Sequence, residues 1–342
     1  MKLAFFVNEI AVEHPEMATT RLAKAAVEGS HEVWYVGAGD VEFDTSQQLL
    51  ARARRAEVIE GDTLETFLAR IKKRDAERLV MDSLDALFLR NEEATEMQER
   101  PWAGPLGTVF GQMLAARGVT VVNDPVTLSR ATSKLYLEEF PQSVRPRSLV
   151  TRDAGAIRRF VAEVGKSVVK PIYGGKGRNV FVVEDENETN LAQIIEAVFE
   201  DGYAIAQEFV DGGEEGDARI FLLDGKLIEI DGAYAAFRRV PDGNDPRANI
   251  SKGGRMKPLE IGAREKDIVD TMGPKLAADG LFFVGIDVVG HKVLEINADS
   301  PGGIQSIEWL YETDICPAII EALRERASGR PAGPNHSPDA TC

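Results

Sequence analysis

The first third of the chain alternates short apolar, β-branched runs with segments whose apolar residues have helical spacing. The predicted order is strand 2–7, helix 15–29, strand 31–37, strand 85–90, helix 104–118 and strand 119–124. Strands that alternate with helices form a parallel sheet covered on both faces. This part therefore predicts a doubly wound parallel α/β domain over residues 1–125, and the turn residues Asn-Asp-Pro end it.

The rest of the chain changes character twice. Residues 126–202 predict a small α+β unit, which begins with one helix at 127–140 and contains a Gly-rich loop between two strands. Residues 203–327 are dominated by antiparallel strands and close with a long helix at 303–327, kinked at Pro317. The last residues, 328–342, are rich in Pro, Gly and Ser and predict a flexible tail.

Charge and composition exclude several classes of protein. The 342 residues carry a net charge of −16, from 40 Lys+Arg and 56 Asp+Glu. This charge argues against binding to nucleic acid or to an anionic membrane surface. The sequence has no apolar stretch long enough for a membrane span and no signal-peptide pattern. Two cysteines are too few for a disulfide framework, so we expect a cytoplasmic protein.

The stretch "FFVGIDVVGHKVLEIN" predicts a buried hairpin, yet it contains Asp287, Glu295 and Asn297. Glu295 and Asn297 are two residues apart and so share one face of a strand. A two-residue loop "GH" would pair Asp287 with Leu294 and turn it to the other face. A three-residue loop at 290–292 pairs Asp287 with Glu295 and gathers all three oxygen donors. We therefore predict the three-residue loop.

Two carboxylates and an amide oxygen without nearby His or Cys form a set of hard oxygen donors. Such a set suits Mg²⁺ that is bound jointly with phosphate groups. The alternative is a solvated outer face, which is common for charged residues. The flanking apolar residues favour the metal site, because they leave little room for solvation.

The stretch "VVKPIYGGKGRNVFVV" contains Gly174, Gly175 and Gly177. It fits neither the dinucleotide-binding fingerprint nor the P-loop, because both need a following helix and here a strand follows. Glycines at such a flap let backbone N–H groups approach phosphate oxygens closely. A plain hairpin turn is the alternative. Lys170 favours the phosphate site, because it ends an apolar strand, where its ammonium group needs an anionic partner. Lys134 is a second candidate, although alone it would be an ordinary solvated lysine.

These features occur in the order found in the ATP-grasp ligases, and the chain resembles the bacterial-type glutathione synthetases from Met1 to about Ala327. The similar segments are "VVNDPVTLSRATSKLYLEEFP", "VVKPIYGGKG", "IAQEFV", "GDARIFLLDG", "RVPDGNDPRANISKGGR" and "FVGIDVVGHKVLEINADSP". The resemblance implies an ATP-grasp fold: an N-terminal α/β domain, a lid at 126–202 with the Gly-rich flap, and a core at 203–327 with the metal and substrate sites.

The resemblance also implies roles for single residues. The implied ATP site comprises Lys134, Lys170, Gly174, Gly175, Gly177, Gln207, Glu208, Phe209, Val210 and Asp217, with 208–210 lining the adenine pocket. The implied ligands of Mg²⁺, or of Mn²⁺ in its place, are Asp287, Glu295 and Asn297. The implied catalytic residues, facing the peptide carboxylate and the acyl phosphate, are Arg219, Arg239, Arg247 and Asn249. The implied substrate-binding residues are Arg90, Arg255, Gly253, Gly254, Ser300, Pro301 and Gly302, with Arg90 facing the γ-glutamyl group.

The arginines support an anion site independently of the resemblance. Five of them lie between residues 219 and 255 of an acidic protein, and planar guanidinium groups suit carboxylate and phosphate. Any one of them alone could equally be a solvated surface residue.

The implied activity is an ATP-dependent ligation through an acyl phosphate, which joins a γ-glutamylcysteine-like dipeptide to a glycine-like amine. The resemblance also implies a homo-oligomer, as is usual for the family. A related ligase for another carboxylate and amine is the second reading. The chain has "NEEATE", "ADSPGG" and "YGGKG" where the family commonly has other residues, and these changes lie mostly near the peptide and acceptor ends. A nucleotide-binding module without catalysis is the third reading, although the intact Asp287, Glu295, Asn297 set argues against it.

Overall fold

The computed structural model describes residues 1–174, 178–212, 216–230, 232–240 and 255–329. The chain forms two compact units, Met1–Val126 with the segment from Asp314 onward, and Thr127–Thr313. None of the described helices combines the length and the apolar character that a membrane span requires.

The first unit is built on a mixed sheet. Its parallel part has the order β2-β1-β6-β7 and is extended beyond β2 by antiparallel strands. The parallel strands are β1 (Lys2–Val7), β2 (Glu32–Gly37), β6 (Ala86–Leu89) and β7 (Thr120–Val122), and the added strands are β3 (Val41–Phe43), β4 (Leu49–Ala56) and β5 (Glu77–Val80). Residues 3–7 of β1 are fully buried, as expected for a parallel strand covered on both faces. The predicted α/β class is confirmed, while β3, β4 and β5 were not predicted.

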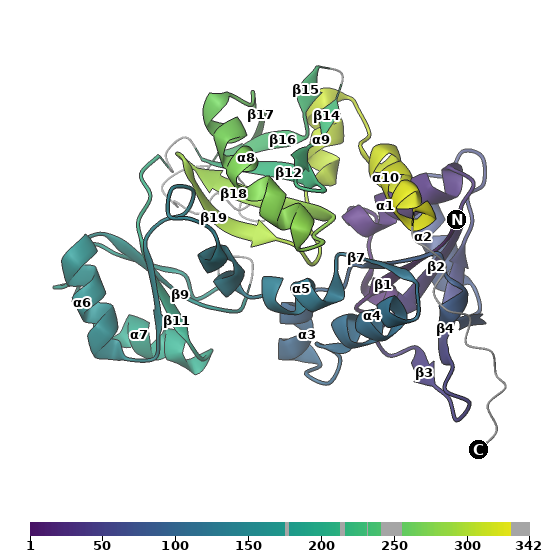
Figure 1. Ribbon diagram of the computed structural model, residues 1–342, viewed down its shortest axis with the longest axis horizontal. Coiled ribbons are helices and arrows are strands. Elements are labelled where there is room, and N and C mark those ends of the chain that lie inside the picture. Colours follow the sequence, from purple (N-terminus) through teal and green to yellow (C-terminus); the bar gives the residue numbers. More distant parts are fainter. Residues whose placement is uncertain (175–177, 213–215, 231, 241–254, 330–342) are drawn as a thin grey trace. The chain divides into compact units, whose positions relative to one another are not determined.

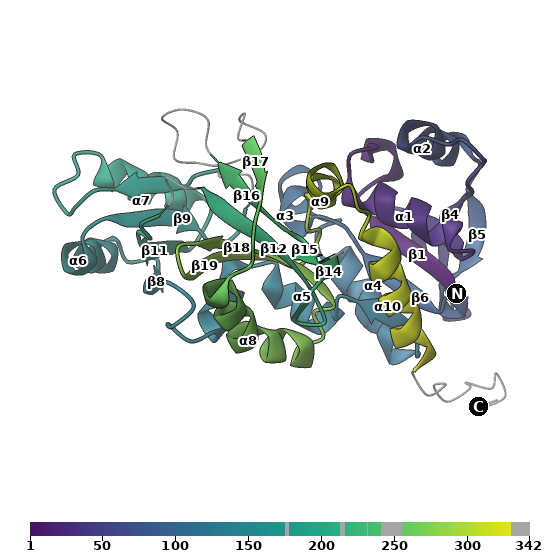
Figure 2. The same cartoon turned by 90° about the horizontal axis from the view of Figure 1, so that it is seen from above.

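Helices cover this sheet on both sides (Figures 1 and 2). They are α1 (Ala18–Glu28), α2 (Leu64–Lys73), α3 (Glu93–Glu99), α4 (Leu106–Ala116) and α10 (Cys316–Ser328), with the short 3-10 turns η1 (Ile10–Val12) and η2 (Met81–Ser83). The helix α10 comes from the end of the chain and lies beside α1 in both views. It buries an apolar stripe that includes Ile319, Ile320 and Leu323.

The predicted single helix at 303–327 is two helices. The first, α9 (Ile304–Tyr311), ends where Glu312 adopts a left-handed backbone conformation, with a φ of 54°. The second, α10, starts at Cys316 and has Pro317 in its first turn. Proline is tolerated there because the first-turn N–H groups have no helical partner. Pro317 therefore begins a helix and does not kink one.

The second unit contains a four-stranded sheet of order β10-β9-β11-β8. Its strands are β8 (Ser148–Thr151), β9 (Ser167–Pro171), β10 (Phe181–Val183) and β11 (Ala204–Glu208), and its helices are α6 (Ala154–Val164) and α7 (Leu191–Glu200). Both helices lie beside this sheet (Figure 1). Their apolar residues form one buried cluster with Val169, Ala204 and Ala206. Because Val169 and Ala206 are paired and side chains alternate along a strand, Lys170 and Gln207 lie on the opposite face.

The unit also contains a larger antiparallel sheet of order β17-β16-β12-β18-β19, with β13 beside β12 and a separate pair β14-β15. The strands are β12 (Asp217–Leu223), β13 (Lys226–Leu227), β14 (Glu229–Ile230), β15 (Ala233–Tyr234), β16 (Ala236–Val240), β17 (Arg255–Pro258), β18 (Phe283–Val289) and β19 (Lys292–Asn297), accompanied by α8 (Ala263–Ala278) and α9. This sheet confirms the antiparallel character predicted for the last third.

The predicted helix at 127–140 is also divided. The helix α5 (Pro125–Ala131) is followed by the 3-10 helix η3 (Lys134–Glu139). Ser133 separates them, and its side chain accepts a hydrogen bond from the Leu135 backbone N–H. Serine favours such a cap over a position inside a helix.

The predicted three-residue loop between β18 and β19 is wrong. Val289 pairs with Lys292, which leaves a two-residue loop of Gly290 and His291. Asp287 nevertheless pairs with Glu295, because the register shifts by one residue between Asp287 and Val288. This shift is a β-bulge on β19, which inserts one additional residue. The bulge produces the pairing for which the longer loop was proposed.

A close backbone contact joins α8 to the turn between β12 and β13. Asp224 and Gly225 have φ values of 48° and 73°, as a tight Asp-Gly hairpin turn requires. A Cβ atom on Gly273 of α8 would lie 2.2 Å from the Gly225 carbonyl oxygen, and one on Gly225 would lie 2.1 Å from the Gly273 oxygen. Only glycine at both positions allows this approach.

We predict that Gly273→Ala lowers the free energy of unfolding by about 1–3 kcal/mol, because the backbone must move apart to admit a methyl group. This loss should exceed the gain from alanine's better helix propensity. Urea unfolding measures it. Gly302→Ala is the control in the same unit, because a Cβ atom there meets nothing within 4 Å. Equal stability of the two variants would contradict the prediction.

Candidate functional site

The face of the four-stranded sheet that lies opposite α6 and α7 carries a buried lysine. Lys170 on β9 is 7% exposed, and its Nζ donates to Oε1 of Gln207 on β11, 2.9 Å away. Burial lowers the pKa of Lys170 to about 8, although the Glu295 carboxylate acts in the opposite direction. An amide oxygen does not neutralise a buried ammonium group, so this position favours the binding of an anion.

Lys134 lies at the start of η3 and reaches the same region. Its backbone N–H donates to the Ile172 carbonyl at 3.0 Å, and its Nζ donates to the Gly174 carbonyl at the root of the flap. The Lys134 Nζ also lies 3.6 Å from Oε1 of Glu295. The structure thus brings together Lys134, the flap root and one predicted metal ligand. Gly175 and Gly177 lie outside the described residues.

The end of β11 holds the three residues predicted to line the adenine pocket. The backbone N–H of Glu208 donates to the Arg147 carbonyl, and that of Phe209 donates to the Lys166 carbonyl. The ammonium group of Lys166 lies 4.5 Å from the centre of the Phe209 ring. Glu208, Phe209 and Val210 are all half-buried. A nucleotide base at this position would therefore need backbone groups other than those two N–H groups.

A charged network surrounds Asp287 at the centre of the larger sheet. Arg219, its cross-strand neighbour, donates from Nε and Nη2 to the two Asp287 carboxylate oxygens at 2.5 and 2.9 Å. Arg239 Nη2 lies 3.0 Å from Asp287 Oδ2, and Arg239 also pairs with Asp217. Asp287 and Arg219 are 6% and 7% exposed. Two carboxylates and two guanidinium groups thus balance one another inside the protein.

The pKa values in this network follow its geometry. Burial alone would raise the pKa of Asp287, but Arg219 and Arg239 outweigh it and hold the pKa at about 2. Asp217 is different, because burial raises its pKa in spite of the contact with Arg239. Of the two carboxylates, Asp287 is therefore the stronger acid, and it stays ionised at neutral pH.

The three predicted metal ligands share one region of the hairpin. Asp287 faces Glu295 across the strands, and the Asn297 amide donates to Asp287 Oδ2 at 3.3 Å. No three His, Cys, Asp or Glu side chains in the described part of the chain could hold a metal ion by themselves. A cation here would depend on the Asn297 oxygen and on phosphate oxygens of a nucleotide, as is usual for Mg²⁺. The donor set fits Mg²⁺ on these terms, although Asp287 already binds two arginines.

The remaining predicted residues lie in several places. The Gly302 carbonyl accepts from Arg219 Nη1 at 2.9 Å, which joins the stretch 300–302 to the charged network. Arg255 is exposed on β17. Arg247, Asn249, Gly253 and Gly254 lie outside the described residues. Arg90 belongs to the first unit, where it follows β6.

Arg90 has a charged neighbour that the sequence did not reveal. Arg90 is 3% exposed, and its Nε lies 3.4 Å from the Thr19 hydroxyl at the start of α1. Among the charged groups that affect the pKa of Glu13, Arg90 has the largest effect. The stretch "AVEHPEM" around Glu13 has neither helical nor strand periodicity. Nothing in the sequence marks this glutamate as buried.

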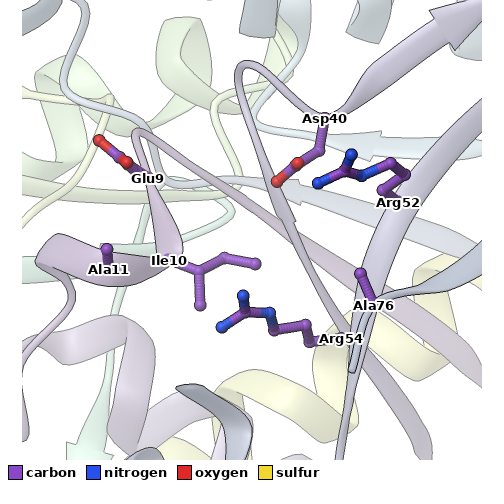
Figure 3. Close-up of a pocket in the computed structure, with 7 residues that line it drawn as sticks. All are labelled: Glu9, Ile10, Ala11, Asp40, Arg52, Arg54 and Ala76. Carbon is purple, nitrogen blue, oxygen red and sulfur yellow. The ribbon is translucent and has the colours of Figure 1, made fainter. Parts of the chain in front are cut away.

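The first unit also has a cavity of about 230 Å³ that contains none of the predicted residues. Figure 3 shows Asp40 and Arg52 pointing toward one another across it and Arg54 extending toward Ile10. The lining residues are Glu9, Ile10, Ala11, Asp40, Arg52, Arg54 and Ala76. The formal charges of its two arginines and two carboxylates sum to zero, so the lining gives no strong preference for a charged ligand.

Comparison with known protein families shows which family this chain belongs to. The model of the prokaryotic glutathione synthetase N-terminal domain matches residues 1–129, and that of the prokaryotic glutathione synthetase ATP-grasp domain matches residues 133–312. The chain belongs to the prokaryotic glutathione synthetase family. It is therefore an ATP-dependent ligase with the ATP-grasp fold.

Relatives within the glutathione synthetase family cover nearly the whole chain. The glutathione synthetase of Synechococcus elongatus is 31% identical over 329 residues, which are 94% of this chain and 98% of that protein. That of Synechocystis sp. is 32% identical over 328 residues, with the same two shares. That of Agrobacterium fabrum is 34% identical over 74% of this chain and 75% of its own.

More distant solved structures share the ATP-grasp fold. The ATP-grasp ligase PsnB, complexed with a minimal precursor, has a TM-score of 0.61 at 21% identity and covers 95% of this chain and 99% of its own. The D-cycloserine synthetase DcsG has a TM-score of 0.64 at 15% identity and covers 95% of this chain and 100% of its own. At these identities the likeness shows the fold of this glutathione synthetase family member and nothing about its substrates.

We predict that Arg219→Ala destabilises this protein by about 3–5 kcal/mol, because Asp287 would keep its charge in a buried position with one guanidinium group fewer. Urea unfolding measures the loss. Arg159→Ala is the control, because the side chains of Arg159 and its partner Asp153 are 73% and 62% exposed. An exposed pair of this kind contributes little to stability, because solvent screens it.

The double variant Arg219→Ala/Asp287→Ala should recover part of the lost stability, because it removes the uncompensated carboxylate. A double variant that is no more stable than Arg219→Ala alone would contradict the charge argument.

Proposed function

We propose that this chain joins γ-glutamylcysteine to glycine with the hydrolysis of ATP, giving glutathione, ADP and phosphate in the cytoplasm. The observation that carries the proposal is the match of the two family models over residues 1–129 and 133–312. The lysines, arginines and hairpin carboxylates described above support it, because they supply the charges that such a reaction needs.

The reaction we propose has two steps. The cysteinyl carboxylate of the dipeptide attacks the ATP γ-phosphorus, which breaks the bond to the β,γ-bridging oxygen and gives an acyl phosphate and ADP. The glycine amine then attacks the acyl carbon, forms the amide and releases phosphate and a proton. No side chain forms a covalent intermediate. The protein acts by positioning the reactants, neutralising charge and excluding water.

We assign the phosphate-binding role to Lys134 and Lys170. The ammonium group of Lys170 is buried beside Gln207, and that of Lys134 lies between the flap root and Glu295. Two ammonium groups that are largely shielded from solvent would hold the ATP phosphates. We assign the adenine-binding role to the end of β11 at 208–210. We assign a phosphate-binding role to the flap glycines Gly174, Gly175 and Gly177, of which the last two lie outside the described residues.

Mg²⁺, or Mn²⁺ in its place, would be held by Asp287, Glu295 and Asn297 and would supply charge neutralisation to the transferred phosphoryl group. Arg219 and Arg239 would hold the reacting carboxylate and the acyl phosphate, together with Arg247 and Asn249. Both described arginines are anchored by carboxylates, which fixes their guanidinium planes. Asp217 serves as such an anchor for Arg239. The family resemblance implies that it also lies near the ribose or the metal.

We further propose that the second unit has two functional parts, a lid and a core, which the sequence predicted at 126–202 and 203–327. Residues 314–327 of that predicted core belong to the first unit. The two separate sheets support a division into two parts. Because β11 (Ala204–Glu208) belongs to the four-stranded sheet, the boundary falls after β11 and not at residue 202. The acceptor amine would bind beside Ser300, Pro301 and Gly302, next to Arg219. Gly253, Gly254 and Arg255 would complete that region.

The test is phosphate release from ATP and Mg²⁺ with a panel of γ-glutamyl dipeptides and amines. Release that requires γ-glutamylcysteine, glycine and the metal supports the proposal. Release with a different pair would show that the changed segments "NEEATE" and "ADSPGG" have altered the substrates. A folded protein that releases no phosphate with any pair would contradict the proposed reaction.

We predict that ATP binding weakens as pH rises above 8, because Lys170 loses its proton there. The pKa of Lys170 is about 8, so the ammonium form that attracts phosphate dominates below pH 8 and is lost above it. Calorimetric titration with ATP and Mg²⁺ between pH 7 and 9.5 should show a dissociation constant that rises by up to about tenfold per pH unit.

Lys170→Met is the matched variant for this prediction. It should bind ATP weakly at every pH and lack the rise above pH 8. The same pH profile in both proteins would assign the effect to another group.

A further inference from the structure

Glu13 is a buried carboxylate that the proposed mechanism does not use. It follows the 3-10 turn η1 and is 5% exposed. Its Oε2 atom has no hydrogen-bond partner within the described part of the chain. A buried polar atom without a partner costs free energy, so it needs an explanation such as a bound ligand, an ion, a water molecule or a functional role.

The contrast with Asp287 shows that Glu13 is not part of a closed ion pair. The two carboxylates are about equally buried, and each has arginine nearby. The pKa of Asp287 is held low by two arginines that donate directly to it. The pKa of Glu13 is instead raised by burial to about 7, and Arg90 only partly opposes this. Arg90 therefore leaves Glu13 able to accept another cation.

Glu13 lies beside a position of the first unit's sheet at which ligands commonly bind. The strands β1 and β6 are parallel neighbours, and the chain leaves β1 through α1 to reach β2 on the other side. The strand order thus reverses between β1 and β6. Open α/β sheets bind ligands at the carboxyl ends of strands at such a point. Glu13 lies in the loop after β1, and Arg90 directly follows β6.

The helix α1 adds a positive end to the same region. Arg90 contacts Thr19 in its first turn, and the N-cap residue Met17 makes no side-chain hydrogen bond to that turn. The N-terminus of a helix favours a negative group. Arg90 and the α1 N-terminus thus suit a carboxylate, while the open oxygen of Glu13 suits an ammonium group.

We propose that Glu13 binds the α-ammonium group of the donor dipeptide. It would do so beside Arg90, to which the family resemblance already assigns the γ-glutamyl group and which would take the α-carboxylate. The inference rests on the proposed function, because it takes the donor to be a γ-glutamyl dipeptide. A γ-linked glutamate carries both charges on one carbon atom, and these two residues supply one oppositely charged partner for each. Glu13 then determines specificity, because it selects donors that carry a free α-ammonium group.

The experiment compares γ-glutamylcysteine with glutarylcysteine, which lacks only the α-ammonium group. With glycine and Mg-ATP, the wild-type kcat/KM should be about 10- to 100-fold lower for glutarylcysteine, the size expected for one charge-assisted hydrogen bond. Glu13→Gln should lower the value for γ-glutamylcysteine to nearly that of glutarylcysteine. The KM for ATP and for glycine should change less than twofold.

Glu16→Gln is the matched control, because Glu16 is an exposed glutamate in the same loop. It should keep the wild-type preference. Wild-type protein that uses both donors equally would overturn the inference without any variant. A Glu13→Gln protein that keeps the full preference would also overturn it. Absence of turnover with either donor in folded wild-type protein would instead remove the proposed function and this inference together.

A pH profile separates this role from a merely structural one. Glu13 must be ionised to bind an ammonium group, so the wild-type KM for γ-glutamylcysteine should fall from pH 6 to pH 8. Arg90, Glu92 and Lys72 are the charged groups that act on it, and the Tyr35 hydroxyl also faces it. All four remain in Glu13→Gln, whose KM should stay constant over this range. The same fall in the variant would overturn the inference.

Discussion

The charged network around Asp287 is the interaction on which the core of the second unit depends. Four charges from three neighbouring strands lie in a buried position, and each is neutralised by another. Removal of any one leaves a buried charge without its partner, which costs more than the pair contributes. The network thus fixes the register of β12, β16 and β18 with respect to one another. It also aligns two guanidinium groups beside the hairpin that carries Glu295 and Asn297.

The features of this region that depend on neighbouring residues of one strand were predicted well from the sequence. The apolar hairpin, the face shared by Glu295 and Asn297, and the buried Lys170 all follow from alternation along single strands. The pairing of Asp287 with Glu295 was predicted correctly, but from a loop length that is wrong. The bulge that produces it has no local signal, because the additional residue lies inside an ordinary apolar run. Only the contact between the two strands reveals it.

Other features could not be read from the sequence because tertiary contacts decide them. The strand β4, "LLARARRA", does alternate, but its buried members include Ala51 and Ala53, which have low β-propensity. Glu13 gives no signal because its burial depends on strands and a helix far along the chain. The ion pairs of Asp287 were also not foreseen. Oxygen donors in an apolar strand indicate that a cation is needed, but not whether that cation is a metal ion or a guanidinium group.

The position of α10 has a consequence for how the protein is made. This helix belongs to the first unit, although the whole second unit precedes it in the chain. The ribosome therefore completes residues 127–313 before it supplies the helix that packs beside α1. During that interval the α1 side of the first unit lacks its cover, so this unit cannot follow the usual order in which N-terminal domains fold first. A nascent chain of this protein would expose an apolar surface to chaperones until α10 leaves the ribosome.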